Sequence, residues 1–164
     1  MKISIIGTGM IATEVIKMLR NEAKGIEITS IFSHSNKEKA LTLAKENDID
    51  HVYTDYAQLL KEDDADFVYI ALVNNAHNTY MRQALEAQRN VIVEKPFTST
   101  LEEAKLLAQM ARERGLYLFE AVTPLHTPNF QLVKQSLKRI APYISHNVIS
   151  RNTPVNTSVT NRAI

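Results

Sequence analysis

Two charged residues that could take part in catalysis, Glu94 and Lys95, follow an apolar run at residues 91–93 and precede Pro96. The apolar run is typical of a strand buried in a sheet. Pro96 restricts Lys95 to an extended conformation and fixes the exit of the chain. A lysine ammonium in that place could orient a substrate hydroxyl or carbonyl and share its proton as a hydride moves. The alternative is an ion pair at the edge of a sheet, which would contribute little to stability.

A glycine-containing turn near the N-terminus has the spacing used for binding dinucleotides. The sequence GTGMIA occupies residues 7–12, directly after one predicted strand and at the start of a predicted helix. Gly7 permits the tight turn, Gly9 lets the backbone approach a pyrophosphate, and Ala12 allows helix and strand to pack closely. The start of the helix would offer free N–H groups and a partial positive charge to the phosphates. In this context the turn predicts dinucleotide binding, although a glycine at such a place can also be only a turn.

The end of the second predicted strand bears on which dinucleotide is bound. Proteins specific for NAD usually place a carboxylate there, on the ribose 2′-OH, and residues 32–37 contain none. Four side chains could instead hold a 2′-phosphate, which favours NADP over NAD: Ser33, His34, Ser35 and Lys37. In the alternative reading Ser35 only caps a helix and Lys37 is a solvated side chain, so both cofactors stay open.

These residues need elements that bring strand ends together, and the sequence predicts such elements. Strands are predicted at residues 2–6, 26–32, 51–53, 67–72, 90–94 and 116–122. Helices are predicted from Met10 to Arg20, from a capping box at Ser35 to Glu46, after Asp55, from His77 to Gln88, from a capping box at Thr100 to Gly115, and from Thr127 to Ile140. This alternation predicts an α/β fold with a doubly wound parallel sheet of Rossmann type.

The amino-acid composition excludes several kinds of site and of binding partner. Because there is no cysteine, disulfides, zinc–thiolate sites and thiol catalysis are excluded, and no metal site is predicted. No segment approaches the roughly 20 apolar residues that cross a bilayer, so we expect a cytoplasmic protein without a membrane partner. Five scattered basic residues follow Glu120 without clustering, so we do not expect nucleic-acid binding. We expect a dinucleotide-binding domain at residues 1–140 and an irregular polar tail, with one extra strand as an alternative, at residues 141–164.

Four motifs together resemble the glucose–fructose oxidoreductase/inositol dehydrogenase/MocA-like (Gfo/Idh/MocA) family over residues 1 to about 140. They are GTGMIA, an N-x-x-H at Asn74 and His77, the EKP of residues 94–96, and the pair Glu120-Ala121. The resemblance implies an NAD(P)-dependent oxidoreductase that transfers hydride between nicotinamide and a sugar, a polyol or a related alcohol or ketone. It implies that Lys95 is catalytic, that Gly7, Thr8, Gly9, Met10 and Ile11 cradle the pyrophosphate, that Ser33, His34 and Lys37 lie near the adenosine ribose, and that Asn74, His77, Glu94 and Glu120 lie near the nicotinamide half.

Two departures from the family pattern leave alternatives open. Val73 stands where the family usually has proline, and no acid follows Glu120 to supply the Asp/His pair of the family's second domain. We therefore expect a truncated chain that lacks the substrate domain. It would be an oxidoreductase, or a non-catalytic nucleotide-binding remnant or partner subunit. A third alternative is a homodimer formed through an exposed surface around Phe97, Leu125 and Phe130.

Overall fold

The computed structural model describes residues 1–122, 128–130 and 132–137 of the chain. Backbone contacts divide the chain into two units, Met1–Val122 and Thr123–Ile164. In the second unit, residues 128–130 and 132–137 are helical, as predicted, whereas Thr127, Ile140 and the predicted tail at residues 141–164 lie outside the described residues. The predicted domain boundary at residue 140 therefore stays a prediction.

The first unit is built on one sheet of six parallel strands in the order β3-β2-β1-β4-β5-β6. The strands are β1 (Lys2–Ile6), β2 (Glu27–Phe32), β3 (His51–Tyr53), β4 (Phe67–Ile70), β5 (Asn90–Glu94) and β6 (Leu118–Ala121). The chain winds outward from β1 to β3, then crosses back to β4 on the other side of β1 and continues to β6. A crevice therefore opens between the ends of β1 and β4, where sheets of this kind bind ligands.

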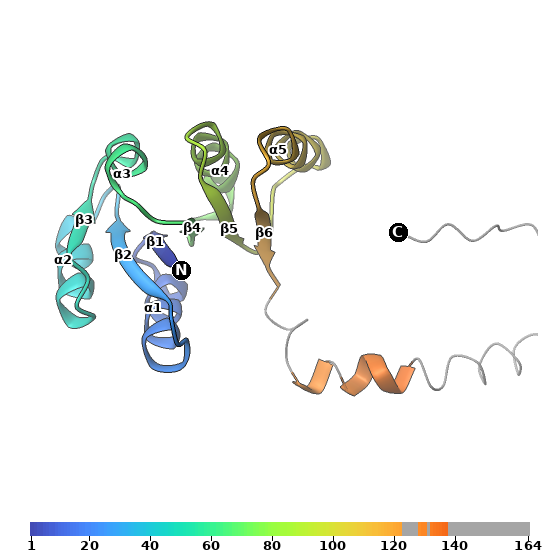
Figure 1. Cartoon of the computed structure of the whole chain (residues 1–164), viewed down its shortest axis with the longest axis horizontal. Helices are drawn as coiled ribbons and strands as arrows, with labels where there is room; N and C mark the ends of the chain where they lie inside the picture. The colour runs from blue at the N-terminus through green and yellow to red at the C-terminus, as the bar shows by residue number, and fades with distance from the viewer. Residues whose placement is uncertain (123–127, 131, 138–164) are drawn as a thin grey trace, which may run out of the picture. The chain divides into compact units, whose positions relative to one another are not determined.

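Helices cover both faces of the sheet. They are α1 (Met10–Glu22), α2 (Lys37–Glu46), α3 (Tyr56–Glu62), α4 (His77–Glu86) and α5 (Leu101–Arg114), with a short 3₁₀ turn, η1 (Asn74–Ala76), before α4. Figure 1 shows α1 and α2 on one side of the sheet and α3, α4 and α5 on the other. The predicted doubly wound α/β fold is thus confirmed.

Two hydrophobic cores hold these layers together. Because successive side chains of a strand point to opposite faces, Ile5 of β1 packs with Ile16 of α1, whereas the adjacent Ile6 packs with Met81 of α4 and Leu107 of α5. The central strands carry apolar residues on both faces, as expected for a parallel sheet covered on both sides. This double coverage holds the strand ends, and the loops that follow them, in fixed positions.

The helix ends confirm most of the predicted caps and correct one. The Thr100 hydroxyl and the Glu103 side chain form the reciprocal capping box of α5, and Gly115 ends that helix in the left-handed conformation with φ of 66°. The prediction that Ser35 caps α2 is wrong. Asn36 is the cap, because its side-chain oxygen accepts a hydrogen bond from Lys39 N at 2.9 Å.

The surface expected around Phe97 also differs from the prediction. Phe97 is half-buried and packs against the core beneath α4 and α5 rather than standing exposed. Leu125 lies outside the described residues, and Phe130 is 37% exposed. Of the three residues named for a dimer surface, only Phe130 is both described and exposed.

Candidate functional site

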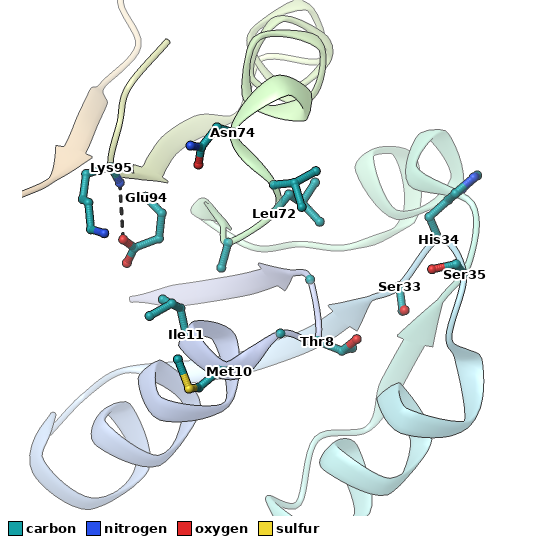
Figure 2. Close-up of a pocket in the computed structure, with 14 residues that line it drawn as sticks. Thr8, Met10, Ile11, Ser33, His34, Ser35, Leu72, Asn74, Glu94 and Lys95 are labelled. Atoms are coloured by element: carbon teal, nitrogen blue, oxygen red, sulfur yellow. Dashed lines mark hydrogen bonds between the residues drawn. The ribbon is translucent and has the colours of Figure 1, made fainter. Parts of the chain in front are cut away.

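A cavity of about 430 Å³ opens at the carboxyl ends of the strands, within the range usual for small-molecule sites. We call it the strand-end cavity. Loops after β1, β2, β4 and β5 form its wall, so residues far apart in the sequence meet there (Figure 2). The lining residues are Gly7, Thr8, Gly9, Met10, Ile11, Ser33, His34, Ser35, Ala71, Leu72, Val73, Asn74, Glu94 and Lys95.

The two glycines of the first turn have different physical roles. Gly7 has φ of +124°, and a Cβ there would lie 2.4 Å from the carbonyl oxygen of Ala71. Only glycine fits at this position, because the turn passes against the end of β4. Gly9 has φ of −69°, and a Cβ there would meet nothing within 4 Å. The fold itself does not require glycine at Gly9, and the space in front of it belongs to the strand-end cavity.

Helix α1 points its N-terminus into the same region. Gly9 is the residue before its first turn, and no side chain caps it. The first backbone N–H groups of a helix lack partners within the helix and carry a partial positive charge. Met10 and Ile11 at this end are exposed. The turn and the helix end together suit the approach of an anionic pyrophosphate.

The end of β2 provides the other side of the cavity. Figure 2 shows Ser33, His34 and Ser35 here, away from Glu94 and Lys95. The Ser33 hydroxyl is buried and accepts a hydrogen bond from Asn36 N at 3.2 Å, whereas His34 and Ser35 are exposed. Since no carboxylate lines this end, hydroxyl and imidazole groups are what a ligand meets.

Glu94 and Lys95 lie at the opposite end, and the ion pair considered as an alternative for them is not among the salt bridges of the described residues. The salt bridge found among the described residues joins Lys2, at the amino end of β1, to Asp64, and so it lies at the other edge of the sheet. The Glu94 carboxylate instead accepts a bond from Tyr69 OH at 2.6 Å and one from Lys95 N at 3.3 Å. The Lys95 side chain is exposed, so its ammonium is available to a ligand.

Burial determines which partner of the Tyr69–Glu94 pair gives the proton. Burial raises the pKa of the Tyr69 hydroxyl, and the hydrogen bond to Glu94 raises that pKa further. The phenol therefore stays protonated and donates, and the carboxylate accepts. Tyr69 thus fixes the orientation of a carboxylate at the edge of the strand-end cavity.

The structure brings most of the predicted site residues together, with three exceptions. Lys37 is an exposed first-turn residue of α2 and does not line the cavity. His77 is fully buried, with Nδ1 2.9 Å from Pro96 O and Nε2 3.1 Å from Leu72 O. Glu120 lies on β6, where its Oε1 accepts a bond from Phe97 N at 2.8 Å. His77 and Glu120 therefore contact the loops behind the cavity instead of lining it.

Several residues that shape the site received no role from the sequence. Ala71, Leu72 and Val73 line the cavity but carry no chemically distinctive side chain. Their position directly after β4 was the available signal, because β4 pairs with β1 and so ends beside the glycine turn. Tyr69 lies within an apolar run, where nothing in the sequence marks its partner on β5.

The described part of the chain shows neither a metal-binding cluster nor a membrane-spanning helix. No group of three or more His, Asp or Glu side chains there is arranged to hold a metal ion. Every helix in the same residues is too short or too polar to cross a bilayer.

Comparisons with known proteins point to one family. Residues 1–122 match the Gfo/Idh/MocA family model, described as an oxidoreductase family with an NAD-binding Rossmann fold. The chain is 32% identical over 139 residues to the uncharacterized oxidoreductase YgjR of Escherichia coli (strain K12), covering 85% of this chain and 42% of that protein. It is 28% identical over 139 residues to the scyllo-inositol 2-dehydrogenase (NADP(+)) IolU of Bacillus subtilis (strain 168), with the same two coverages of 85% and 42%.

Solved structures give the same result. A variant of the 3-ketoreductase KijD10 from Actinomadura kijaniata, in complex with TDP-benzene and NADP, matches with a TM-score of 0.78 and 31% identity, over 85% of this chain and 44% of that one. The WlbA dehydrogenase from Chromobacterium violaceum, in complex with NADH and UDP-GlcNAcA, matches with a TM-score of 0.79 over 85% of this chain and 40% of that one. At 19% identity the WlbA match supports the fold alone. The chain spans less than half the length of each of these relatives.

Proposed function

The chain belongs to the Gfo/Idh/MocA oxidoreductase family with its NAD-binding Rossmann fold, and from this premise we propose that the strand-end cavity binds a nicotinamide dinucleotide for hydride transfer. The open space in front of Gly9 carries the proposal. The fold does not need glycine there, since a Cβ would meet nothing within 4 Å. A glycine at that position makes physical sense when a ligand approaches the backbone at the start of α1.

The residues around the cavity fit the parts of such a cofactor. The glycine turn and the start of α1 would receive the pyrophosphate, Ser33, His34 and Ser35 the adenosine ribose, and Asn74 and Glu94 the nicotinamide half. We favour NADP over NAD, because no carboxylate lines the adenosine end to bind a free 2′-OH. The name of IolU and the ligand of KijD10 support NADP, although the family description and the WlbA complex leave NAD open.

Lys95 is the proposed catalytic residue. When bound, the cofactor supplies or accepts a hydride. The exposed Lys95 ammonium would orient the substrate hydroxyl or carbonyl and would hold or give the proton at that oxygen. Glu94, whose carboxylate is held by the Tyr69 hydroxyl, would accept hydrogen bonds from the cofactor at the edge of the cavity.

The proposed substrate is a sugar or a polyol. The printed names of relatives include scyllo-inositol 2-dehydrogenase (NADP(+)), at 28% identity, and 1,5-anhydro-D-fructose reductase from Ensifer adhaerens, at 36% identity over 115 residues. Both names describe redox chemistry at a carbon that bears oxygen on a polyhydroxylated ring. A cytoplasmic location, expected from the sequence, remains a prediction, and a homodimer remains an alternative.

A second candidate is a domain that binds the dinucleotide without turning over a substrate. The chain spans about 42% of YgjR and of IolU, so the activity of those whole proteins is a proposal for this chain. The two candidates make different predictions for one experiment. The purified chain is incubated with NADP or NAD and a panel of inositols and sugars, and nicotinamide absorbance is followed. If the chain oxidises any compound of the panel, and replacement of Lys95 abolishes that activity, the enzyme is supported. Dinucleotide binding with no turnover on the panel supports the binding domain.

A further inference from the structure

His77 differs most from its expected place in the cavity wall. It is the first residue of α4, yet its side chain is fully buried and does not line the strand-end cavity. A buried polar side chain normally has a hydrogen-bond partner, because an unsatisfied one is costly. The partners of His77 therefore indicate what it does.

Both partners are backbone carbonyls of the loops that form the cavity wall. Nε2 lies 3.1 Å from the carbonyl oxygen of Leu72, in the loop after β4, and Nδ1 lies 2.9 Å from that of Pro96, in the loop after β5. Leu72 lines the cavity, and Pro96 directly follows Lys95, which also lines it. The imidazole ring thus joins two loops that are 24 residues apart in the sequence.

Beyond the ends of β4 and β5 no sheet pairing joins these two loops, so side-chain contacts must connect them. The pairing of β4 with β5 ends at Ile70 and Val93. Beyond that point the loops continue toward Asn74 and Lys95, which Figure 2 shows on the wall of the cavity. Glu120 fixes the same β5 loop from its other side through the bond to Phe97 N.

Each ring nitrogen of His77 faces a different carbonyl oxygen, so the two contacts can be removed one at a time by substitution. Carbonyl oxygens only accept, so a neutral imidazole can donate to one of them and an imidazolium can donate to both. An asparagine amide nitrogen can take the place of Nδ1, and a glutamine amide nitrogen can take the place of Nε2. Each substitution would keep one connection and remove the other.

We infer that His77 is a positioning residue that fixes the loops after β4 and β5 against each other, and so sets the placement of Asn74 and Lys95 around the nicotinamide half. This inference rests on the proposed function for its consequence, but the connection between the loops exists without any ligand. His77 does not touch the cofactor in this account; it acts through the backbone of Leu72 and Pro96.

The test compares His77→Leu, His77→Asn and His77→Gln in the full chain. The first readout is amide hydrogen exchange without ligand, followed at residues 72–74 and 97–98. We expect faster exchange in both segments of the leucine variant, with little change in β1 and α5. The asparagine variant should restore protection at residues 97–98, and the glutamine variant should restore it at residues 72–74. If His77→Leu does not fold, the asparagine and glutamine variants carry the comparison, since each keeps one donor.

The second readout is binding of NADPH, compared with binding of ADP, which contains the adenosine and the pyrophosphate but no nicotinamide riboside. We expect the leucine variant to lose on the order of tenfold in NADPH affinity and to bind ADP within about twofold of the wild type. Exchange that is unchanged in both segments, or that rises uniformly over the domain, would overturn the inference, as would an equal loss for both ligands. If the wild type binds neither NADPH nor NADH, the proposed function fails, while the exchange data still decide whether His77 connects the loops.

Discussion

The hydroxyl of Tyr69 on β4 donates to Oε1 of Glu94 on β5 at 2.6 Å, across the end of the strand pair that borders the strand-end cavity. The other oxygen of the same carboxylate accepts a bond from Lys95 N at 3.3 Å. Glu94 is therefore held from two sides, by a side chain of β4 and by the backbone that follows it. The strand thus ends in a carboxylate of fixed orientation, followed by an exposed lysine.

The first prediction concerns this pair. Tyr69→Phe should release the carboxylate and weaken NADPH binding by about fivefold, the equivalent of about 1 kcal/mol for one hydrogen bond. Tyr56→Phe is the matched control, because it removes the 3.3 Å bond from Tyr56 OH to Tyr80 O, away from the cavity. Fluorescence titration of both variants makes the comparison. Equal NADPH affinities for Tyr69→Phe and the wild type would show that the orientation of Glu94 does not matter for binding.

The second prediction separates the two glycines of the first turn. Gly7→Ala should lower the free energy of unfolding by about 3 kcal/mol, because it combines a Cβ clash with a φ that favours glycine. Gly9→Ala should leave the melting temperature unchanged and lower NADPH affinity by at least about tenfold, because its methyl group fills only the space of the ligand. Thermal melts and NADPH titrations of both variants measure these effects. A lower melting temperature of Gly9→Ala with an unchanged affinity for NADPH would contradict the role given to Gly9.

The third prediction concerns Lys95. Lys95→Ala should lower kcat for an accepted sugar or polyol by on the order of 100-fold, the range for a lost proton-transfer group. Since the side chain is exposed, the melting temperature and the affinity for NADPH should stay close to those of the wild type. Lys95→Arg keeps the charge but not the shape of the ammonium, and it should recover only part of the rate. A loss of NADPH binding as large as the loss of rate would argue that Lys95 binds the cofactor instead.

The fourth prediction tests cofactor preference at the end of β2. Ser35 is exposed and does not cap α2, because Asn36 does, so it can be changed without removing a helix cap. Ser35→Asp would place a carboxylate beside the adenosine ribose, and it should shift the ratio of NADPH to NADH affinity toward NADH by about tenfold. Ser35→Ala is the control for the loss of the hydroxyl. The ratio of dissociation constants measures the outcome, and an unchanged ratio in Ser35→Asp would place the ribose elsewhere.

The sequence predicted the sheet and the cavity wall because both depend on local patterns. Apolar runs, capping boxes and the glycine at residue 115 mark the elements, and parallel strands necessarily bring their carboxyl ends to one edge. The glycine turn, Asn74 and Lys95 were therefore placed correctly at that edge. The cap of α2 was misplaced by one residue because Ser35 and Asn36 are both good capping residues, and only the backbone geometry decides between them.

Side-chain direction and contacts across the sheet were beyond sequence reasoning. The N-x-x-H spacing indicated correctly that His77 follows β4. It did not indicate that the two ring nitrogens face Leu72 O and Pro96 O inside the protein. Glu120 likewise bonds to Phe97 N, on a segment 23 residues earlier. The Tyr69–Glu94 pair depends on which face of each strand meets the other. These contacts become visible only once the strands are in register.

The most direct test of the central claim is a titration of the purified 164-residue chain with NADPH and with NADH, followed by nicotinamide fluorescence and melting temperature. We predict saturable binding of both with a preference for NADPH, and a rise in melting temperature on saturation. Absence of binding by either dinucleotide, from a chain that melts cooperatively, would contradict the assignment of the strand-end cavity as a cofactor site.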